Sequence, residues 1–131
     1  MIALDTNVLV RYLVEDDVRQ AALAAKLIET LCTKDDPGFV NRIVLCEVVW
    51  VLESAYGYPR ATVADTIDKL LRTAELEIDA GEAAWSALGA YRAGAADFAD
   101  AFIGRLNRSA GCSGTATFDR AAAKLEDFFT P

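Results

Sequence analysis

The hydrophobic and polar positions of this chain form blocks that predict a mixed α/β fold. Short apolar runs are typical of buried strands, whereas apolar residues that recur every three or four positions indicate helices. Strands are expected at 1–4, 39–40, 76–78, 114–118 and 128–129. Helices are expected at 7–13, 18–31, 42–56, 61–73, 82–92, 97–109 and 120–125.

Strands that alternate with helices predict a parallel sheet, because right-handed crossovers carry the connecting helices over both faces of the sheet. The expected fold class is therefore α/β, with a single three-layer α/β/α domain around a central parallel sheet over residues 1–131. In such sheets, ligands bind beyond the carboxyl ends of the strands. Two of the predicted strands end at an aspartate, Asp5 and Asp119, so a site is expected there.

Composition agrees with one globular domain. The chain has 131 residues, of which 53% are hydrophobic and 25% are charged, enough for a core of its own. No run approaches the length of a membrane-spanning helix, and the first residues do not resemble a secretion signal. The three cysteines, Cys32, Cys46 and Cys112, show no metal or disulfide spacing, and a cytoplasmic location is expected.

Charge and residue content restrict the chemistry. The chain has no histidine, which excludes Ser-His-Asp and Cys-His catalysis and histidine-ligated metals. The net charge is −7, so the protein has no global positive field to attract a polyanion. An anionic substrate would have to be brought in by something other than bulk charge.

Acidic residues in four separate segments are the candidates for that role. Glu47 stands out because its neighbours on the predicted helix face are apolar, and an unpaired carboxylate on such a face is costly. Those neighbours are Ile43, Val44, Trp50 and Val51. A buried pair with Arg42, or a rim position that reaches water, would explain Glu47 without any function.

The other candidates also have plain structural explanations. Asp5 and Asp119 could each cap the helix that follows. Asp97 and Asp100 share one face at the start of a helix, which suits either a cap with an acidic third residue or a pair of metal ligands. The acidic run at 15–17 is interpreted as a solvated turn, and Trp50 and Trp85 as core or interface residues.

An all-carboxylate set has a definite chemical preference. Oxygen ligands suit Mg²⁺ or Mn²⁺ and disfavour zinc. Such a metal polarises a phosphate and lowers the pKa of a bound water, so that hydrolysis needs no histidine. It would also bridge an acidic protein to an anionic backbone. The residues themselves therefore favour a metal-dependent phosphodiesterase.

Four segments carry a family resemblance. They read IALDTNVLV at 2–10, CEVVWVL at 46–52, DFADAFI at 97–103 and TATFD at 115–119. In this order and spacing they resemble the successive motifs of PIN-domain proteins, and within that superfamily the VapC-type toxins of bacterial toxin–antitoxin pairs. Two positions depart from the pattern, since Cys46 stands where a serine or threonine is common and Gly104 where alanine is usual.

The resemblance implies an α/β/α domain with Mg²⁺- or Mn²⁺-dependent endoribonuclease activity. It places the metal-binding acids at Asp5, Glu47, Asp100 and Asp119, with Asp97 as an extra acid. It gives Thr6, Asn7 and Thr117 the task of orienting the acids or the water. It also implies RNA as substrate, inhibition of translation and growth by the free protein, a cognate VapB-type antitoxin, a homodimer and a toxin–antitoxin hetero-oligomer, and no membrane partner.

Five arginines near these segments are candidates to hold RNA. They are Arg11, Arg42, Arg105, Arg108 and Arg120. Phosphotransfer domains that place an aspartate at a strand end are a rival interpretation, but the haloacid-dehalogenase type needs a second aspartate where this chain has Asn7. A non-catalytic PIN-like binding module with a degenerate or structural metal site is the remaining alternative.

Overall fold

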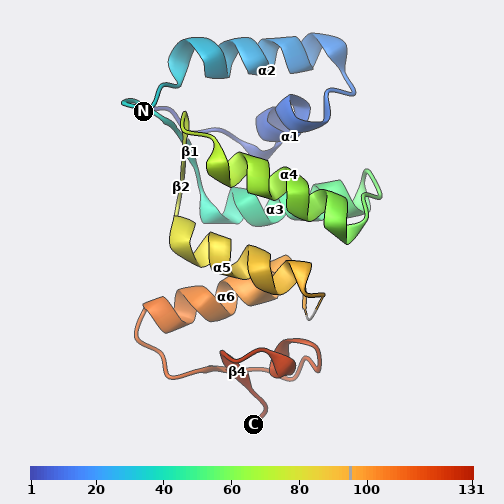
Figure 1. The fold of residues 1–131 in the computed structure, drawn as a ribbon, viewed down its shortest axis with the longest axis vertical. Helices are drawn as coiled ribbons and strands as arrows, with labels where there is room; N and C mark the ends of the chain where they lie inside the picture. Colours follow the sequence, from blue (N-terminus) through green and yellow to red (C-terminus); the bar gives the residue numbers. More distant parts are fainter. Residues whose placement is uncertain (95) are drawn as a thin grey trace. The chain divides into compact units, whose positions relative to one another are not determined.

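The computed structural model describes residues 1–94 and 96–131 and divides the chain into two compact units. The first unit spans Met1–Asp79 and the second spans Ala80–Pro131. Each unit combines helices with a pair of parallel strands, and the two are described in turn (Figure 1).

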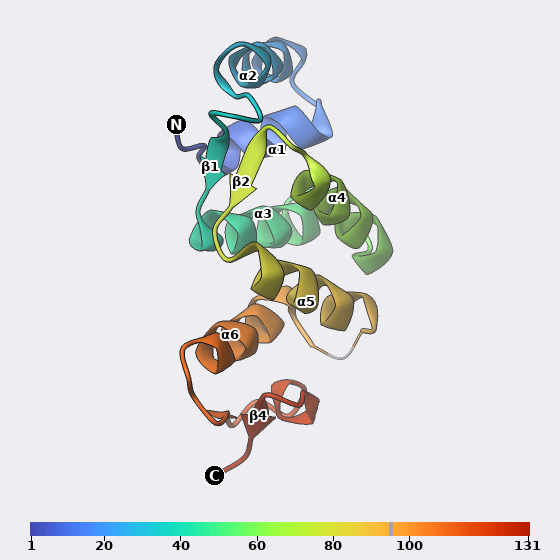
Figure 2. The same cartoon turned by 60° about the vertical axis from the view of Figure 1, so that its left-hand side comes forward.

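The first unit contains four helices and two strands. They are α1 (Thr6–Val14), α2 (Val18–Leu31), β1 (Gly38–Val40), α3 (Arg42–Ser54), α4 (Arg60–Arg72) and β2 (Leu76–Ile78). The two strands pair in parallel, with Gly38 opposite Leu76 and Val40 opposite Ile78, and Figure 2 shows them side by side. Helices α3 and α4 form the crossover between them, as the alternating pattern predicts.

The N-terminal segment joins this sheet through a single bridge. Ala3 pairs in parallel with Phe39, where the amide of Leu4 donates to the Phe39 carbonyl and the Phe39 amide donates to Ile2. Only the bridge of the predicted strand at 1–4 therefore forms. It is enough to bury Leu4 and to fix the residue that follows, Asp5.

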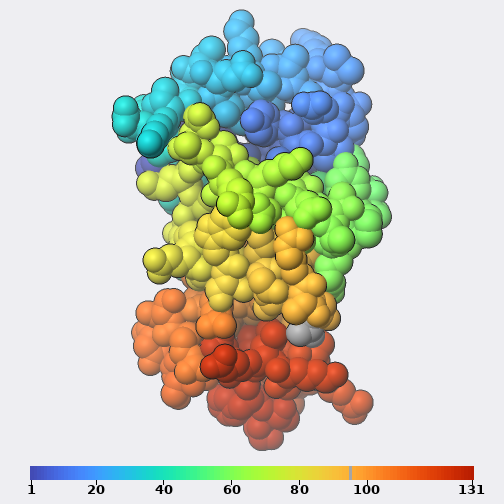
Figure 3. Space-filling view, viewed as in Figure 1, coloured from blue at the N-terminus to red at the C-terminus, as the bar shows by residue number. Residues whose placement is uncertain are grey.

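The core of the first unit lies between its helices and its sheet. Fully buried apolar side chains come from every helix, among them Leu9, Ile28, Leu45, Leu52 and Ile67. Helix α2 packs along α1, as the space-filling view shows in two shades of blue (Figure 3). Asp17 begins α2 by accepting a hydrogen bond from the Gln20 amide.

The second unit contains two long helices and a short C-terminal segment. Its elements are α5 (Gly81–Arg92), α6 (Phe98–Ser109), β3 (Thr115–Ala116), a 3-10 helix η1 (Ala122–Lys124) and β4 (Phe128–Phe129). Strands β3 and β4 pair in parallel. Tyr91, Phe98 and Phe102 are buried with their rings edge to face, which holds α5 against α6.

The C-terminal segment is fastened to α6 by one buried carboxylate. Asp127 is 6% exposed; its Oδ1 accepts from Arg108 Nε at 3.0 Å, and its Oδ2 forms an ion pair with Arg105 Nε at 3.1 Å. Gly104 lies one turn earlier on the same helix, where a Cβ atom would stand 2.5 Å from the Phe128 ring. The missing side chain at Gly104 is therefore what lets β4 approach α6 so closely.

The helices and the short strands β1, β2 and β4 confirm the predicted elements to within a few residues. The prediction of a buried strand at 114–118 was wrong, because β3 spans two residues and Phe118 is 88% exposed. Trp50 is 67% exposed, so it is not a core residue, and its interpretation as an interface residue stays a prediction. No helix in the described part of the chain is long and apolar enough to cross a membrane.

Candidate active site

Asp5 and Thr6 lie where the N-terminal segment enters α1. Asp5 is the N-cap of that helix, and its Oδ1 accepts from the Thr6 amide at 2.7 Å. The capping explanation for Asp5 is therefore correct, and it accounts for Oδ1 of the carboxylate. The side chain remains exposed, so its carboxylate is also open to a ligand from solvent.

Thr6 links this cap to α3. Its side chain is 8% exposed, and its hydroxyl donates to Glu47 Oε2 at 2.8 Å. A buried hydroxyl with a single acceptor fixes the carboxylate that it touches. Thr6 therefore orients Glu47, which agrees with the role that the family resemblance implies for Thr6 or Asn7.

Glu47 itself is exposed, which corrects the expectation that it faces an apolar surface. Helix α3 buries its opposite side through Leu45, Val48, Val49 and Leu52. The apolar neighbours Ile43 and Trp50 are 65% and 67% exposed. Glu47 therefore lies on the solvent side of α3, where an ion or a substrate can reach it.

A cavity of about 590 Å³ opens beside these residues within the first unit. It is lined by Asp5, Thr6, Asn7, Val10, Arg11, Asp16, Glu47, Val51, Ala55 and Tyr56. Three of these side chains are carboxylates, and Arg11 is the one cation among the described residues that line it. The cavity therefore combines metal-ligand chemistry at one end with a positive group at the other.

The second unit holds the remaining acids. Asp97 is the N-cap residue of α6, Asp100 lies in the first turn, and Asp119 follows β3. Burial raises the pKa of the half-buried Asp100 carboxyl, and the charges of Asp119 and Asp97 raise this pKa further. Three carboxylates of like charge thus lie close enough to act on one another, and a cation would relieve that repulsion.

Local hydrogen bonds show what holds each acid of the second unit. The Asp119 amide donates to Thr117 Oγ1 at 3.0 Å, and Asp119 Oδ1 accepts from the Ala122 amide at 2.9 Å. Asp119 therefore accepts from the first residue of η1 without being its N-cap, which is Ala121, and the Thr117 hydroxyl positions the Asp119 amide. Asp97 occupies the N-cap position of α6, as the capping explanation predicts. Its side chain makes no capping hydrogen bond to the described residues.

The five predicted acids thus fall into two sets. Asp5 and Glu47 belong to the first unit, and Asp97, Asp100 and Asp119 belong to the second. Across residues 1–94 and 96–131, no three carboxylate or cysteine side chains form a group that could by itself hold a metal ion. The donor chemistry nevertheless fits Mg²⁺ or Mn²⁺, because both sets offer only oxygen and both are open to solvent.

The five arginines proposed to hold RNA have different surroundings in the structure. Arg42 forms a forked ion pair with Asp79, and Arg105 and Arg108 are committed to Asp127. Arg120 is exposed. Arg11 alone among the five lines a cavity that also contains candidate acids.

Sequence reasoning missed a cluster of three residues at the far end of this cavity. Asp16 accepts from Arg11 Nη1 and from the Tyr56 hydroxyl, each at 2.9 Å, although its segment was interpreted as a solvated turn. Hydrogen bonds from Tyr56 and Arg11 hold the pKa of Asp16 below its usual value. Glu15, in a left-handed conformation after α1, turns the chain so that Asp16 points back, but no pattern reveals that Tyr56 lies nearby.

The whole chain was compared with known proteins. It matches the PIN domain family over residues 2–127, which includes every candidate acid. PIN domains have a three-layer α/β/α fold and are in general metal-dependent nucleases, typically with Mg²⁺ or Mn²⁺. The predicted fold class is thereby confirmed. No curated protein matches the chain.

Proposed function

Because this chain belongs to the PIN domain family, we propose that it is an endoribonuclease that hydrolyses RNA phosphodiester bonds with the help of Mg²⁺ or Mn²⁺. The observation that carries the proposal is the family match over residues 2–127. The exposed carboxylates at the positions of the family motifs support it.

We assign the metal ligands to Asp5, Glu47, Asp100 and Asp119, with Asp97 as a further acid. When bound, the metal would polarise the scissile phosphate and lower the pKa of the attacking water. The Thr6 hydroxyl donates to the Glu47 carboxylate, and the Thr117 hydroxyl accepts from the backbone amide of Asp119. Asn7 lines the same cavity as Asp5 and is exposed, so its amide is available to a water or to the substrate.

The charge of the chain supports a metal-assisted route. With a net charge of −7 and carboxylates at the site, RNA would be repelled unless a cation lay between them. Attack by water, rather than by the ribose 2′-hydroxyl, leaves 5′-phosphate and 3′-hydroxyl ends. The carboxylates hold the cation, and no histidine is required.

The motif spacing supports a narrower role as the toxin of a type II toxin–antitoxin pair. We propose that the free protein cleaves cytoplasmic RNA and inhibits translation and growth. We further propose that a VapB-type antitoxin binds the toxin, and that the toxin itself is a homodimer. In this role the whole chain, 1–131, acts as one nuclease domain.

The test is cleavage of total cellular RNA by purified, antitoxin-free protein with Mg²⁺, with Mn²⁺ and with EDTA. We expect discrete fragments that require the metal. Asp100→Asn should reduce the cleavage rate by on the order of a thousandfold, because the loss of a charged ligand weakens metal binding and transition-state stabilisation together. Asp35→Asn removes the same charge from an exposed loop and should cleave like wild type.

Two results would contradict the proposal. Folded wild-type protein that cleaves no RNA under any of these conditions would favour a non-catalytic binding module. Fragments that end in 2′,3′-cyclic phosphate would contradict attack by water.

A further inference from the structure

Two hydrogen-bond donors converge on one anion at the end of the cavity away from Asp5. Arg11 Nη1 donates to Asp16 Oδ1 and the Tyr56 hydroxyl donates to Asp16 Oδ2, both at 2.9 Å. Arg11 Nη1 also lies 3.3 Å from the Tyr56 oxygen, so the two donors are adjacent. Asp16 thus bridges a guanidinium and a phenol that come from α1 and from the segment just after α3.

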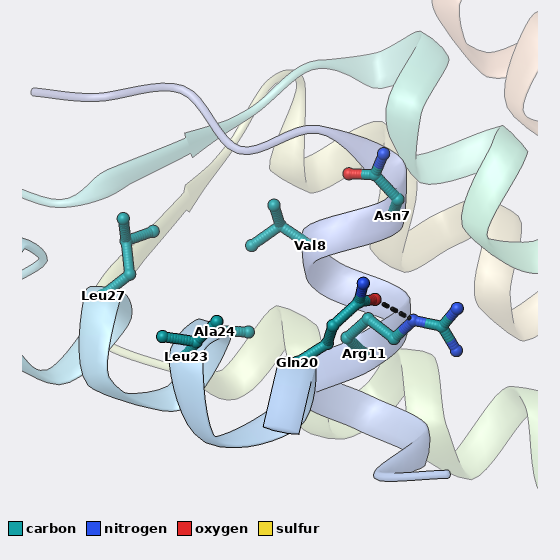
Figure 4. A pocket seen from close by; sticks show the side chains of 7 residues that line it. All are labelled: Asn7, Val8, Arg11, Gln20, Leu23, Ala24 and Leu27. Atoms are coloured by element: carbon teal, nitrogen blue, oxygen red, sulfur yellow. Dashed lines mark hydrogen bonds between the residues drawn. The ribbon is translucent and has the colours of Figure 1, made fainter. Parts of the chain in front are cut away.

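The guanidinium is held in place independently of Asp16. Arg11 Nε donates to Gln20 Oε1 of α2 at 2.7 Å. Figure 4 shows this bond in a neighbouring pocket that Arg11 also lines, with the guanidinium pointing away from Val8 and Leu27. Within the described residues Arg11 Nη2 has no hydrogen-bond partner, so Arg11 can take an anion at Nη1 and Nη2 while Gln20 keeps Nε.

Asp16, which binds Arg11 and Tyr56, is easily displaced from them. Asp16 is exposed and lies in the turn after α1, so moving its side chain into water breaks two surface hydrogen bonds and no packing. A phosphate can offer one oxygen to each Nη atom of an arginine and a further oxygen to the phenol, whereas Asp16 gives one oxygen to Arg11 Nη1 and the other to Tyr56. In free protein the carboxylate of Asp16 takes the place that a phosphate would take.

The position along α1 identifies which phosphate this is. Arg11 lies six residues after Asp5, or roughly 9 Å along the helix axis. A phosphate bound at Arg11 is therefore a different one from the phosphate at Asp5 and Glu47. Arg11 and these two acids line the same cavity.

We propose that Arg11 and Tyr56 form a binding site for a phosphate of the RNA strand next to the scissile one, and that Asp16 occupies this site until RNA displaces it. This inference rests on the proposed ribonuclease function. It makes Asp16 an internal competitor that weakens RNA binding, and Arg11 a substrate-binding residue.

The experiment measures the affinity for a short fluorescein-labelled RNA by anisotropy over a range of KCl concentrations, with Ca²⁺ in place of Mg²⁺ so that a cation lies at the carboxylates while cleavage is suppressed. Arg11→Gln should weaken binding about tenfold, the value of one charge-assisted hydrogen bond. It should also reduce the slope of log affinity against log salt by about 0.7, because one fewer phosphate is neutralised. Asp16→Asn should strengthen binding several-fold.

A double-mutant cycle separates competition from bulk charge. In the Arg11→Gln background, Asp16→Asn should have almost no effect, since the site it vacates no longer binds phosphate. Glu15→Gln removes the same charge from the neighbouring position and should change affinity much less than Asp16→Asn. Gln20→Ala removes the support of Arg11 but not its charge, and should leave the salt slope unchanged. Thermal unfolding of every variant establishes that it is folded.

The inference is overturned if Asp16→Asn leaves binding unchanged or weakens it, or if Glu15→Gln gives an equal gain. It is also overturned if Arg11→Gln leaves the salt slope unchanged. Wild-type protein that cleaves RNA while the variants behave in this way would refute this inference alone. Wild-type protein that neither binds nor cleaves RNA would refute the proposed function and this inference with it.

Discussion

The pKa of Asp100 depends on the groups that surround its carboxyl in the folded protein. Partial burial and the charges of Asp119 and Asp97 all disfavour its ionised form, so its pKa in the folded protein is raised above the ordinary value of 3.8. In unfolded protein these causes vanish. Ionisation of Asp100 therefore opposes folding, and this penalty appears as the pH rises from 3.8 through the raised pKa.

We therefore expect Asp100→Asn to stabilise the metal-free protein at neutral pH and not below pH 3.8. The rise in melting temperature in EDTA should be about 2 °C, because solvent screening at a half-exposed carboxyl keeps the gain below ~1 kcal/mol. Thermal unfolding followed by circular dichroism at the two pH values measures it. A gain of equal size at both pH values would show that charge is not its cause.

The same substitution should slow cleavage by on the order of a thousandfold, as argued above, so activity and stability change in opposite directions at this residue. Such opposition is expected of a functional carboxylate that is maintained at a cost to the fold. The sequence identified Asp100 by its position in a motif. It could not predict the raised pKa, because that depends first on burial in the folded protein and then on the charge of Asp119, which lies 19 residues away along the chain.

At the scale of elements, the predicted helices were confirmed because their apolar spacing and their caps are local properties. Helix α2 occupies the predicted residues, with Asp17 as its cap. The strands were harder to predict, since a strand needs a partner that the chain supplies elsewhere. Thus the segment at 114–118 forms two paired residues rather than five, and residues 1–4 form one bridge.

A glycine pair tests how tightly the C-terminal segment packs on α6. Gly104→Ala places a Cβ atom 2.5 Å from the Phe128 ring, and the overpacking cost of about 1–3 kcal/mol outweighs the gain of ~1 kcal/mol in helix propensity. Gly89 lies in α5 with nothing within 4 Å of its missing Cβ. Urea unfolding should show Gly104→Ala less stable than wild type and Gly89→Ala more stable by about 0.5–1 kcal/mol. Equal gains in both variants would show that the segment is loosely held.

The buried carboxylate of the same segment gives a second test at this scale. Asp127→Asn leaves Arg105 and Arg108 without their shared anion and should lower the free energy of unfolding by about 2 kcal/mol. Glu126→Gln, on the exposed neighbouring residue, should change it by less than ~0.5 kcal/mol. Urea denaturation measures both. A loss at Asp127 no larger than at Glu126 would mean that the ion pairs do not fasten β4 to α6.

At the scale of the whole molecule, the sequence predicted the fold class correctly, whereas its assignment of site residues stays a prediction. The motifs point to Asp5, Glu47, Asp100 and Asp119, which the structure shows as exposed or half-exposed acids beside helix starts or on a helix face. They did not reveal that Thr6 fixes Glu47 or that Arg11, Asp16 and Tyr56 meet. The Thr6–Glu47 and Asp16–Tyr56 contacts join residues about 40 positions apart, and no local pattern encodes them.

Mg²⁺ affinities of single and double variants show whether the two sets of acids bind one metal ion. Glu47→Gln and Asp100→Asn each remove a proposed ligand, one from each unit. If both ligands act on the same ion, each single variant loses most of the Mg²⁺ affinity and the double variant loses little more, because residues that act as a unit are not additive. Isothermal titration calorimetry with Mg²⁺ measures the three affinities, with Asp35→Asn as the control that should bind like wild type. Losses that add in the double variant would mean that the sets bind separate ions, and the proposed assignment of ligands would then have to be divided between two sites.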